Sequence, residues 1–221
     1  MLTMNDLKSA LLFGAILIGL AVNCSRANAA SKEVLTVAGG CFWCVESDFE
    51  SVAGVSEAIS GYIGGTTANP TYKQVSKGGS GHYEAVQIHF NPNRVSRAEL
   101  LDMFFRSVDP TDARGQFCDR GESYRTAIFV SNDSEKQLAQ TAKRNAQEAL
   151  GQKIVTPILT ASTFYQAEDR HQDYYKGKQR VLTRFGPIKQ SNAYKRYRKA
   201  CGRDERVKAL WGDSAPFADA H

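Results

Sequence analysis

The alternation of hydrophobic and polar positions predicts a regular succession of strands and helices along most of the chain. Short apolar or alternating runs are typical of strands, whereas apolar positions three or four residues apart are typical of helices. The predicted strands cover residues 34–38, 55–62, 84–90, 125–130 and 154–159. The predicted helices begin at residues 41 and 96 and cover 134–150 and 168–175, and long loops cover 64–83 and 108–123.

Helix-end residues agree with this assignment. Ser96 and Glu99 have the spacing of a capping box, and Gly151 is typical of a residue that ends a helix. The order is strand–helix–strand twice, followed by a further helix and strand. This order predicts an α+β fold: a two-layer, ferredoxin-like α/β sandwich with a mixed sheet, helices on one face and a C-terminal basic arm.

Composition narrows the class of protein. The chain has 221 residues, of which 42% are hydrophobic, and its formal net charge is +5. Eleven Phe, nine Tyr and two Trp are enough to build a core, so disorder is excluded for most of the chain. A single long apolar run excludes a multi-span membrane protein.

That apolar run lies near the N-terminus and predicts a signal peptide over residues 1–29. Residues 10–22 are apolar, which is too short for a membrane span, and Ala27 and Ala29 suit signal-peptidase cleavage before Ala30. We therefore expect an exported protein, periplasmic or secreted, with no stable membrane insertion after cleavage. An uncleaved N-terminal anchor is the alternative.

The C-terminal part of the chain is strongly basic. Residues 176–208 contain 12 Lys or Arg and two acidic residues. Such a run is typical either of a nucleic-acid contact or of a solvated arm. Because the chain is expected to be exported, we favour a solvated arm over residues 187–221 and expect no nucleic-acid partner. The catalytic domain is then expected over residues 30–186.

Candidate chemistry is concentrated where the first strand turns into a helix. Residues 39–46 read GGCFWCVE, so Cys41 lies at a helix start after two glycines. Free backbone N–H groups there stabilise an anion, which favours Cys41 as a thiolate nucleophile. The C-x-x-C spacing of Cys41 and Cys44 favours redox chemistry. A structural zinc pair would need two further ligands, and no second C-x-x-C or His pair supplies them.

Several separate motifs resemble the methionine sulfoxide reductase A family, in the right order. They are GCFW with Glu46, GYIGG at 61–65, NPTY at 69–72, GHYEAV at 81–86, DPT at 109–111, Asp119 with YRTAIF at 124–129, and FYQAEDRHQ at 164–172. The resemblance spans residues 34–175. It implies thiol-dependent reduction of methionine S-sulfoxide, free or protein-bound, and hence protein repair after oxidation.

The resemblance also implies a role for individual residues. Reduction of a sulfoxide needs a nucleophile, a proton donor for the departing oxygen and an apolar wall for the methyl group. By position, the resemblance implies five catalytic residues: Cys41 as nucleophile, Glu84 as proton donor, Tyr72 and Tyr124 as oxygen-binding hydroxyls, and Asp119 as polar support. It implies that Phe42 and Trp43 bind the substrate as the wall around its methyl group.

The family cycle forms a sulfenic acid that a second thiol resolves to a disulfide. Cys201, in the basic arm, is the first candidate for this resolving thiol, and Cys44 and Cys118 rank behind it. We expect no metal or cofactor, and an external thioredoxin-like dithiol as reductant. Two other functions stay open: a thiol–disulfide oxidoreductase that uses Cys41 and Cys44, and a non-enzymatic binding module.

Overall fold

The computed structural model describes residues 32–219, so the predicted signal peptide lies outside the described residues. The strands are β1 (Glu33–Gly39), β2 (Val55–Ile63), β3 (Tyr83–Phe90), β4 (Gly115–Gln116), β5 (Asp119–Arg120), β6 (Thr126–Val130), β7 (Ile158–Thr160), β8 (Tyr165–Gln166), β9 (Arg180–Thr183) and β10 (Gly186–Lys189). The helices are α2 (Phe42–Glu50), α3 (Tyr72–Lys77), α4 (Arg97–Arg106), α5 (Asp133–Leu150), α6 (Gln190–Cys201) and α7 (Arg203–Trp211). Short 3-10 turns cover Glu122–Tyr124, Asp169–His171, Tyr174–Lys176 and Gly212–Ser214. In this part of the chain, no helix is long and apolar enough to cross a membrane.

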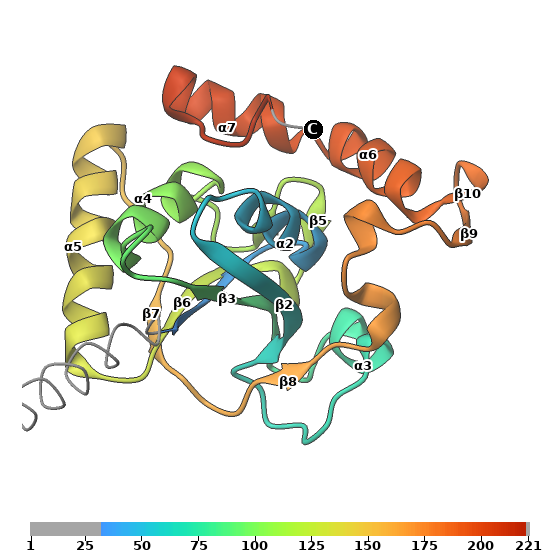
Figure 1. Ribbon diagram of the computed structural model, residues 1–221, viewed down its shortest axis with the longest axis horizontal. Helices are drawn as coiled ribbons and strands as arrows, with labels where there is room; N and C mark the ends of the chain where they lie inside the picture. Colours follow the sequence, from blue (N-terminus) through green and yellow to red (C-terminus); the bar gives the residue numbers. More distant parts are fainter. Residues whose placement is uncertain (1–31, 220–221) are drawn as a thin grey trace, which may run out of the picture. The chain divides into compact units, whose positions relative to one another are not determined.

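A six-stranded mixed sheet forms the centre, in the order β7-β6-β1-β3-β2-β8 (Figure 1). Neighbouring strands run antiparallel except for the parallel pair β6 and β7. The inner four strands and the helices α2 and α4 give the β-α-β-β-α-β order of a ferredoxin-like sandwich. The predicted fold class is therefore confirmed.

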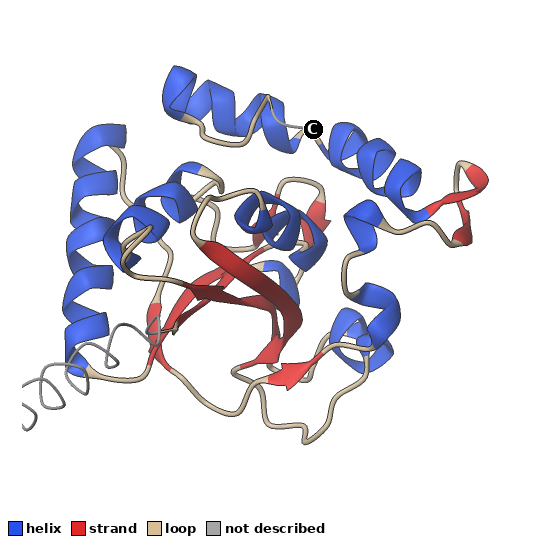
Figure 2. Ribbon diagram, in the orientation of Figure 1, coloured by secondary structure: helices blue, strands red, loops and turns tan. Residues whose placement is uncertain are grey.

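The helices and the main hydrophobic core lie on one face of this sheet (Figure 2). The core brings together aromatic and aliphatic side chains of α2, α4 and the strands, among them Phe49, Phe90, Phe104 and Ile128. A smaller cluster on the other face, around Tyr83 and Phe129, is covered by side chains of residues 159–164. The sheet therefore holds the β1–α2 turn rigidly, because both elements are buried in the core.

The predicted helix ends are present. Ser96 and Glu99 form the capping box before α4, with the Glu99 N–H donating to Ser96 Oγ and the Ser96 N–H donating to the Glu99 carboxylate. Gly151 ends α5 in the left-handed conformation, at φ +65°. Local sequence was sufficient here because a cap depends on a few neighbouring residues.

Four local expectations differ from the structure. The expected loop 108–123 contains the short antiparallel strands β4 and β5. The expected loop 64–83 contains the six-residue helix α3, which buries only Val75 and so has no apolar periodicity to read. The expected strand 154–159 is shortened to Ile158–Thr160, since Pro157 has no N–H to donate. The expected helix 168–175 is two 3-10 turns, interrupted at Asp173 with φ +54°.

The C-terminal basic arm packs against the rest of the described chain and belongs to the same compact unit. The charge pattern predicts a solvated arm, but two of its arginines are buried. Arg198 donates to Asp48 at 2.8 Å, and Arg203 donates to the carbonyls of Gly39 and Ser107 at 3.1 and 2.9 Å. These contacts fix α6 and α7 next to the β1–α2 turn.

Candidate active site

The turn between β1 and α2 requires its two glycines. Gly40 has φ +82°, and a Cβ atom there would lie 2.6 Å from Cβ of Gln116. A Cβ atom on Gly39 would lie 2.9 Å from a methyl group of Val45. Cys41 follows as the N-cap of α2, and its carbonyl accepts the N–H of Cys44 at 3.1 Å. The absence of side chains at Gly39 and Gly40 thus lets Val45 and Gln116 pack closely against the turn.

A cavity of about 410 Å³ lies in front of Cys41. It brings together every site residue predicted from the sequence: Cys41, Phe42, Trp43, Cys44, Tyr72, Glu84, Cys118, Asp119, Tyr124 and Cys201. Sequence reasoning missed the other lining residues, which are Phe117, Tyr174, Leu182, Thr183, Tyr194, Tyr197, Arg198 and Arg203. Most of these residues lie in the basic run over residues 176–208, where the charge pattern does not indicate a pocket.

Glu84 lies on β3 and is 1% exposed. Its Oε2 accepts the backbone N–H of Phe42 at 3.1 Å, whereas its Oε1 is buried without a hydrogen-bond partner among the described residues. Burial, with smaller contributions from Asp119 and Cys44, raises the pKa of Glu84 to about 8. The carboxylic acid is therefore protonated at neutral pH and has one oxygen free for a ligand in the cavity.

Two tyrosine hydroxyls lie in the same cavity. Those of Tyr72 and Tyr124 hydrogen-bond to each other, and burial together with the charge of Glu84 raises the pKa of both well above its ordinary value. Both hydroxyls therefore stay protonated. The N–H of Tyr72 donates to Glu168 at 3.0 Å, and that carboxylate also accepts the hydroxyl of Tyr62 at 2.9 Å. Glu168 thus positions the start of α3.

Aromatic rings form one wall of the cavity. Trp43 stacks on Tyr174 at 3.8 Å between ring centroids, and it also lies 5.7 Å from His171. His171 also lies 4.4 Å from Tyr72 and 5.5 Å from Phe42. Burial lowers the pKa of His171 to about 4, so this ring is neutral at pH 7 and packs as an uncharged ring against the side chains of the wall.

Cys41 and Cys44 are the free cysteines of the described chain and hydrogen-bond to each other. Donation by Cys41, with the nearby charges of Arg203 and Arg198, lowers the pKa of Cys44. That hydrogen bond, burial and the carboxyl groups nearby raise the pKa of Cys41. The helix N-terminus acts in the opposite direction, since it favours a thiolate on Cys41.

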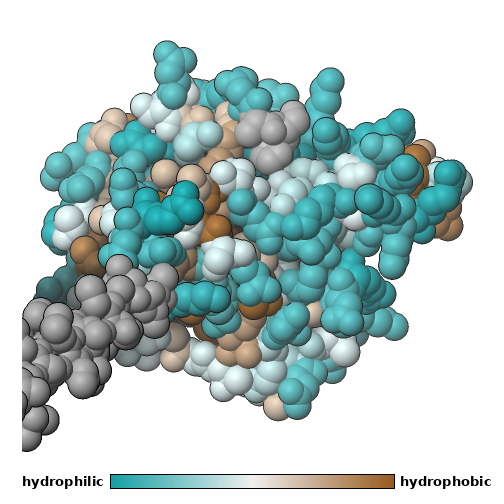
Figure 3. All heavy atoms as spheres, viewed as in Figure 1, coloured by the Kyte–Doolittle hydropathy of each residue, from teal (hydrophilic) through white to brown (hydrophobic). Residues whose placement is uncertain are grey.

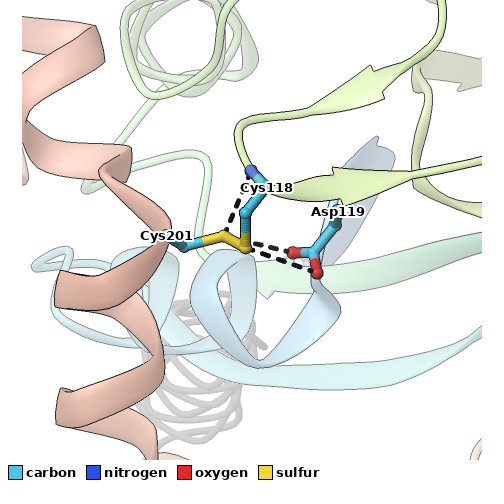
Figure 4. A group of neighbouring side chains, drawn as sticks. All are labelled: Cys118, Asp119 and Cys201. Atoms are coloured by element: carbon cyan, nitrogen blue, oxygen red, sulfur yellow. Dashed lines mark hydrogen bonds between the residues drawn. A yellow bond between two sulfur atoms is a disulfide. The ribbon is translucent and has the colours of Figure 1, made fainter.

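Cys118 and Cys201 form a disulfide at the rim of the cavity, as Figure 4 shows. The bond joins the β4–β5 turn to the end of α6. Asp119 lies beside it, with its carboxylate oxygens 3.9 Å from Sγ of Cys118 and 3.8 Å from Sγ of Cys201. Burial raises the pKa of Asp119, although Arg203 and Arg184 act in the opposite direction. Cys118 is exposed, so its sulfur is within reach of a partner.

We expect the pKa of Glu84 to govern part of the pH dependence of stability. Its folded pKa of about 8 exceeds the ordinary value of 4.5, so the unfolded chain releases this proton first as pH rises. The free energy of unfolding should then fall by up to about 1.4 kcal/mol per pH unit between pH 4.5 and 8. In urea titrations this slope should be shallower for Glu84→Gln than for the wild type, because buried Glu46, whose pKa is raised to about 7, still contributes, whereas the exposed control Glu57→Gln should keep the wild-type slope. Equal slopes in both variants would contradict the assigned burial effect.

A protonated acid, a cysteine pair and a rim disulfide around one cavity define a thiol-dependent oxidoreductase. Residues 33–213 match the family model "Peptide methionine sulfoxide reductase". The chain therefore belongs to this family, whose members reduce methionine sulfoxide.

Curated relatives and solved structures agree with this assignment. The chain is 48% identical to Peptide methionine sulfoxide reductase MsrA 2 of Rhizobium meliloti (strain 1021), covering 93% of this chain and 98% of that one. It is 45% identical to MsrA of Bacillus subtilis (strain 168), covering 82% and 97%. Its structure is similar to reduced Mxr1 from Saccharomyces cerevisiae, with TM-score 0.64, 31% identity and coverage of 68% and 88%. It is also similar to methionine sulfoxide reductase A of Corynebacterium diphtheriae, with TM-score 0.62, 31% identity and coverage of 68% and 76%.

Proposed function

We propose that this enzyme reduces the S epimer of methionine sulfoxide, free or in proteins, through a sulfenic acid at Cys41. The observation that carries the proposal is the free Oε1 atom of the protonated Glu84, which lines the same cavity as the Cys41 thiol. A sulfoxide has a basic oxygen next to an electrophilic sulfur, so it matches an acid and a nucleophile held side by side. A methionine-release assay with the separate S and R epimers tests this proposal.

The chemistry balances with these groups alone. The Cys41 thiolate attacks the sulfoxide sulfur, and Glu84 supplies one proton to the oxygen while the hydroxyls of Tyr72 and Tyr124 hold it. The products are methionine and a sulfenic acid on Cys41. A second thiol then displaces the oxygen as water and leaves a disulfide. Phe42 and Trp43 would contact the methyl group of the substrate.

The cysteine pair gives the nucleophile its proton acceptor. Cys41 donates a hydrogen bond to Cys44, and the charges of Arg198 and Arg203 stabilise a thiolate on Cys44. We propose that Cys44 takes the proton of Cys41 when the sulfoxide binds. These two arginines would then act through Cys44 as positioning residues, which is a role for the basic segment that charge patterning did not reveal.

The thiol–disulfide oxidoreductase alternative is less consistent with this site. Exchange with a protein disulfide needs a sulfur that a partner can approach in line. Cys44 is 7% exposed, and Cys41 lines the cavity that the Cys118–Cys201 disulfide also lines. We therefore expect sulfoxide reduction and no insulin reduction in parallel assays with the same dithiol.

We propose that oxidising equivalents leave the site through Cys201 and Cys118. Cys201 lines the cavity of Cys41 and is bonded to Cys118, which is exposed. Cys201 would resolve the sulfenic acid, and Cys118 would then displace Cys41 and take over the disulfide. A thioredoxin-like dithiol could attack the exposed sulfur of Cys118. Cys44 is the second candidate for the first resolving step, because it already hydrogen-bonds to Cys41.

Variants of Cys201 and Cys44 should separate these routes. We expect Cys201→Ser to release one methionine per enzyme, and then to lose at least about tenfold in turnover with a thioredoxin. Its Cys41 sulfenic acid should be trapped by dimedone. Dithiothreitol can enter the cavity, so turnover with it should largely survive. Normal cycling of Cys201→Ser with thioredoxin, together with stalling of Cys44→Ser, would assign the resolving step to Cys44.

We also propose that residues 1–29 direct export and are removed before Ala30. The apolar run over residues 10–22 supports this proposal, as does a disulfide at an exposed site, which persists in oxidising compartments. N-terminal sequencing of the protein from the native source tests it. A chain that starts before residue 10 and so retains the whole apolar run would favour the uncleaved anchor.

A further inference from the structure

The β9–β10 hairpin carries an unusual apolar surface. Leu182 is 86% exposed, and the other exposed large hydrophobic side chain of the described residues, Leu138, is 38% exposed. Leu182 pairs across the hairpin with Pro187, and the adjacent pair on the same outer face is Arg180 and Lys189. Figure 3 shows hydrophobic atoms over this hairpin, surrounded by hydrophilic ones. The outer face thus presents an apolar pair next to two cations.

The inner face of the same hairpin anchors it to the site. Val181 and Ile188 pack against the cluster that contains Cys44, Tyr174 and Tyr194. The base of the hairpin is continued by α6, whose Tyr197 stacks edge-on with Phe185 at 5.3 Å. The hairpin is therefore held in one place by its buried face, and the exposure of Leu182 does not result from a loose chain end.

Leu182 also borders the cavity of Cys41. Leu182 and Thr183 line that cavity, as does Tyr197. The guanidinium of Arg184 lies over the rings of Phe185 and Tyr197, at 4.9 and 5.1 Å from their centroids. A methionine sulfoxide side chain that enters the cavity from a polypeptide would leave its neighbouring residues outside, at this rim.

We propose that the outer face of the β9–β10 hairpin binds the polypeptide on either side of the oxidised methionine, and that it selects substrates with apolar and acidic neighbours. An apolar neighbour would cover Leu182 and Pro187, and an acidic residue beyond it would pair with Arg180 or Lys189. This inference rests on the proposed reduction of protein-bound methionine sulfoxide. Free methionine sulfoxide has no flanking residues, so it cannot use the hairpin.

The charges support a polypeptide of this kind. The hairpin exposes three cationic side chains, those of Arg180, Arg184 and Lys189. The sequence contains no acidic residue between residues 178 and 203. Exposed cations attract carboxylates and repel basic sequences, and this effect weakens as salt screens it. The exposed Leu182 gains most from an apolar neighbour, because its side chain is still hydrated in the free enzyme.

The test compares three substrates with dithiothreitol as reductant, so that no protein donor needs to dock. They are N-acetyl-methionine sulfoxide amide, a pentapeptide with Leu on both sides of the sulfoxide and Asp at both ends, and a pentapeptide with Ser and Lys instead. We expect wild-type enzyme to prefer the Leu/Asp peptide by about tenfold in kcat/KM. Leu182→Ala should lower kcat/KM for that peptide about fivefold more than for the amide. Arg180→Glu should reduce the preference for Asp over Lys.

Leu138→Ala on α5 is the matched control, since Leu138 is exposed but does not line the cavity. Leu138→Ala should leave kcat/KM unchanged for all three substrates. An equal decrease in kcat/KM for all three substrates in Leu182→Ala, or no decrease for any of them, would overturn the proposal. A defect in Leu182→Ala that appears only when thioredoxin replaces dithiothreitol would assign the hairpin to the donor. Failure of wild-type enzyme on the short amide would instead refute the proposed function itself.

Discussion

Replacement of Cys41 by serine is expected to abolish release of methionine from methionine sulfoxide, by at least about 10³-fold in kcat. A serine hydroxyl has no accessible anion at neutral pH, and oxygen is a weaker nucleophile toward sulfur than a thiolate. The measurement is chromatographic quantification of methionine, with dithiothreitol as reductant so that the resolving route is not limiting.

Cys44→Ser is the matched control, because it removes the other thiol of the same helical turn. This variant should still release methionine in its first turnover, although more slowly if Cys44 accepts the proton of Cys41. Residual turnover of Cys41→Ser above a few per cent would contradict the assignment of Cys41 as nucleophile. Both variants should unfold at similar urea concentrations, since neither substitution changes the side-chain volume much.

Replacement of Glu84 by glutamine should lower kcat about 10²- to 10⁴-fold, the range for a positioned general acid. Glutamine keeps the shape of the side chain and an oxygen for the N–H of Phe42, but it has no acidic proton. Alkylation of Cys41 by iodoacetamide should persist, since the nucleophile is still present. An unchanged rate would show that the proton comes from another group.

The pH dependence of kcat is a second test of the role of Glu84. Glu84 must be protonated to act as an acid, and its pKa is raised to about 8 by burial. The kcat of the wild-type enzyme should therefore fall as pH rises through about 8. The residual activity of Glu84→Gln should lack this alkaline limb. A wild-type rate that rises steadily to pH 9.5 would mean that Glu84 is not the titrating acid.

The sequence allowed the core strands and helices to be predicted because their signals are local. Caps such as Ser96 with Glu99 and breaks such as Gly151 depend on neighbouring residues, and the strand order follows from the β-α-β-β-α-β pattern. The site residues were found by motif order, since no single Tyr or Glu is specific. All of them line one cavity in the structure.

Other features of the site depend on contacts that local sequence patterns do not specify. The pKa of Cys41 is raised by its hydrogen bond to Cys44, by burial and by nearby carboxyl groups. Arg198 and Arg203 look solvated in a basic run, yet they reach Asp48 and the backbone of Gly39 across the fold. The pairing of Cys118 with Cys201 spans 83 residues, and cysteine spacing alone does not specify such a connection.

A single-turnover experiment without any reductant tests the central chemistry most directly. Enzyme with Cys41 reduced is mixed with one equivalent of methionine S-sulfoxide and acid-quenched over time. Methionine and the modification state of the peptide containing Cys41 are then measured by mass spectrometry. The account predicts that each methionine released is matched by one Cys41 converted to a sulfenic acid or a disulfide. Methionine released while Cys41 remains a free thiol that iodoacetamide can alkylate would contradict it.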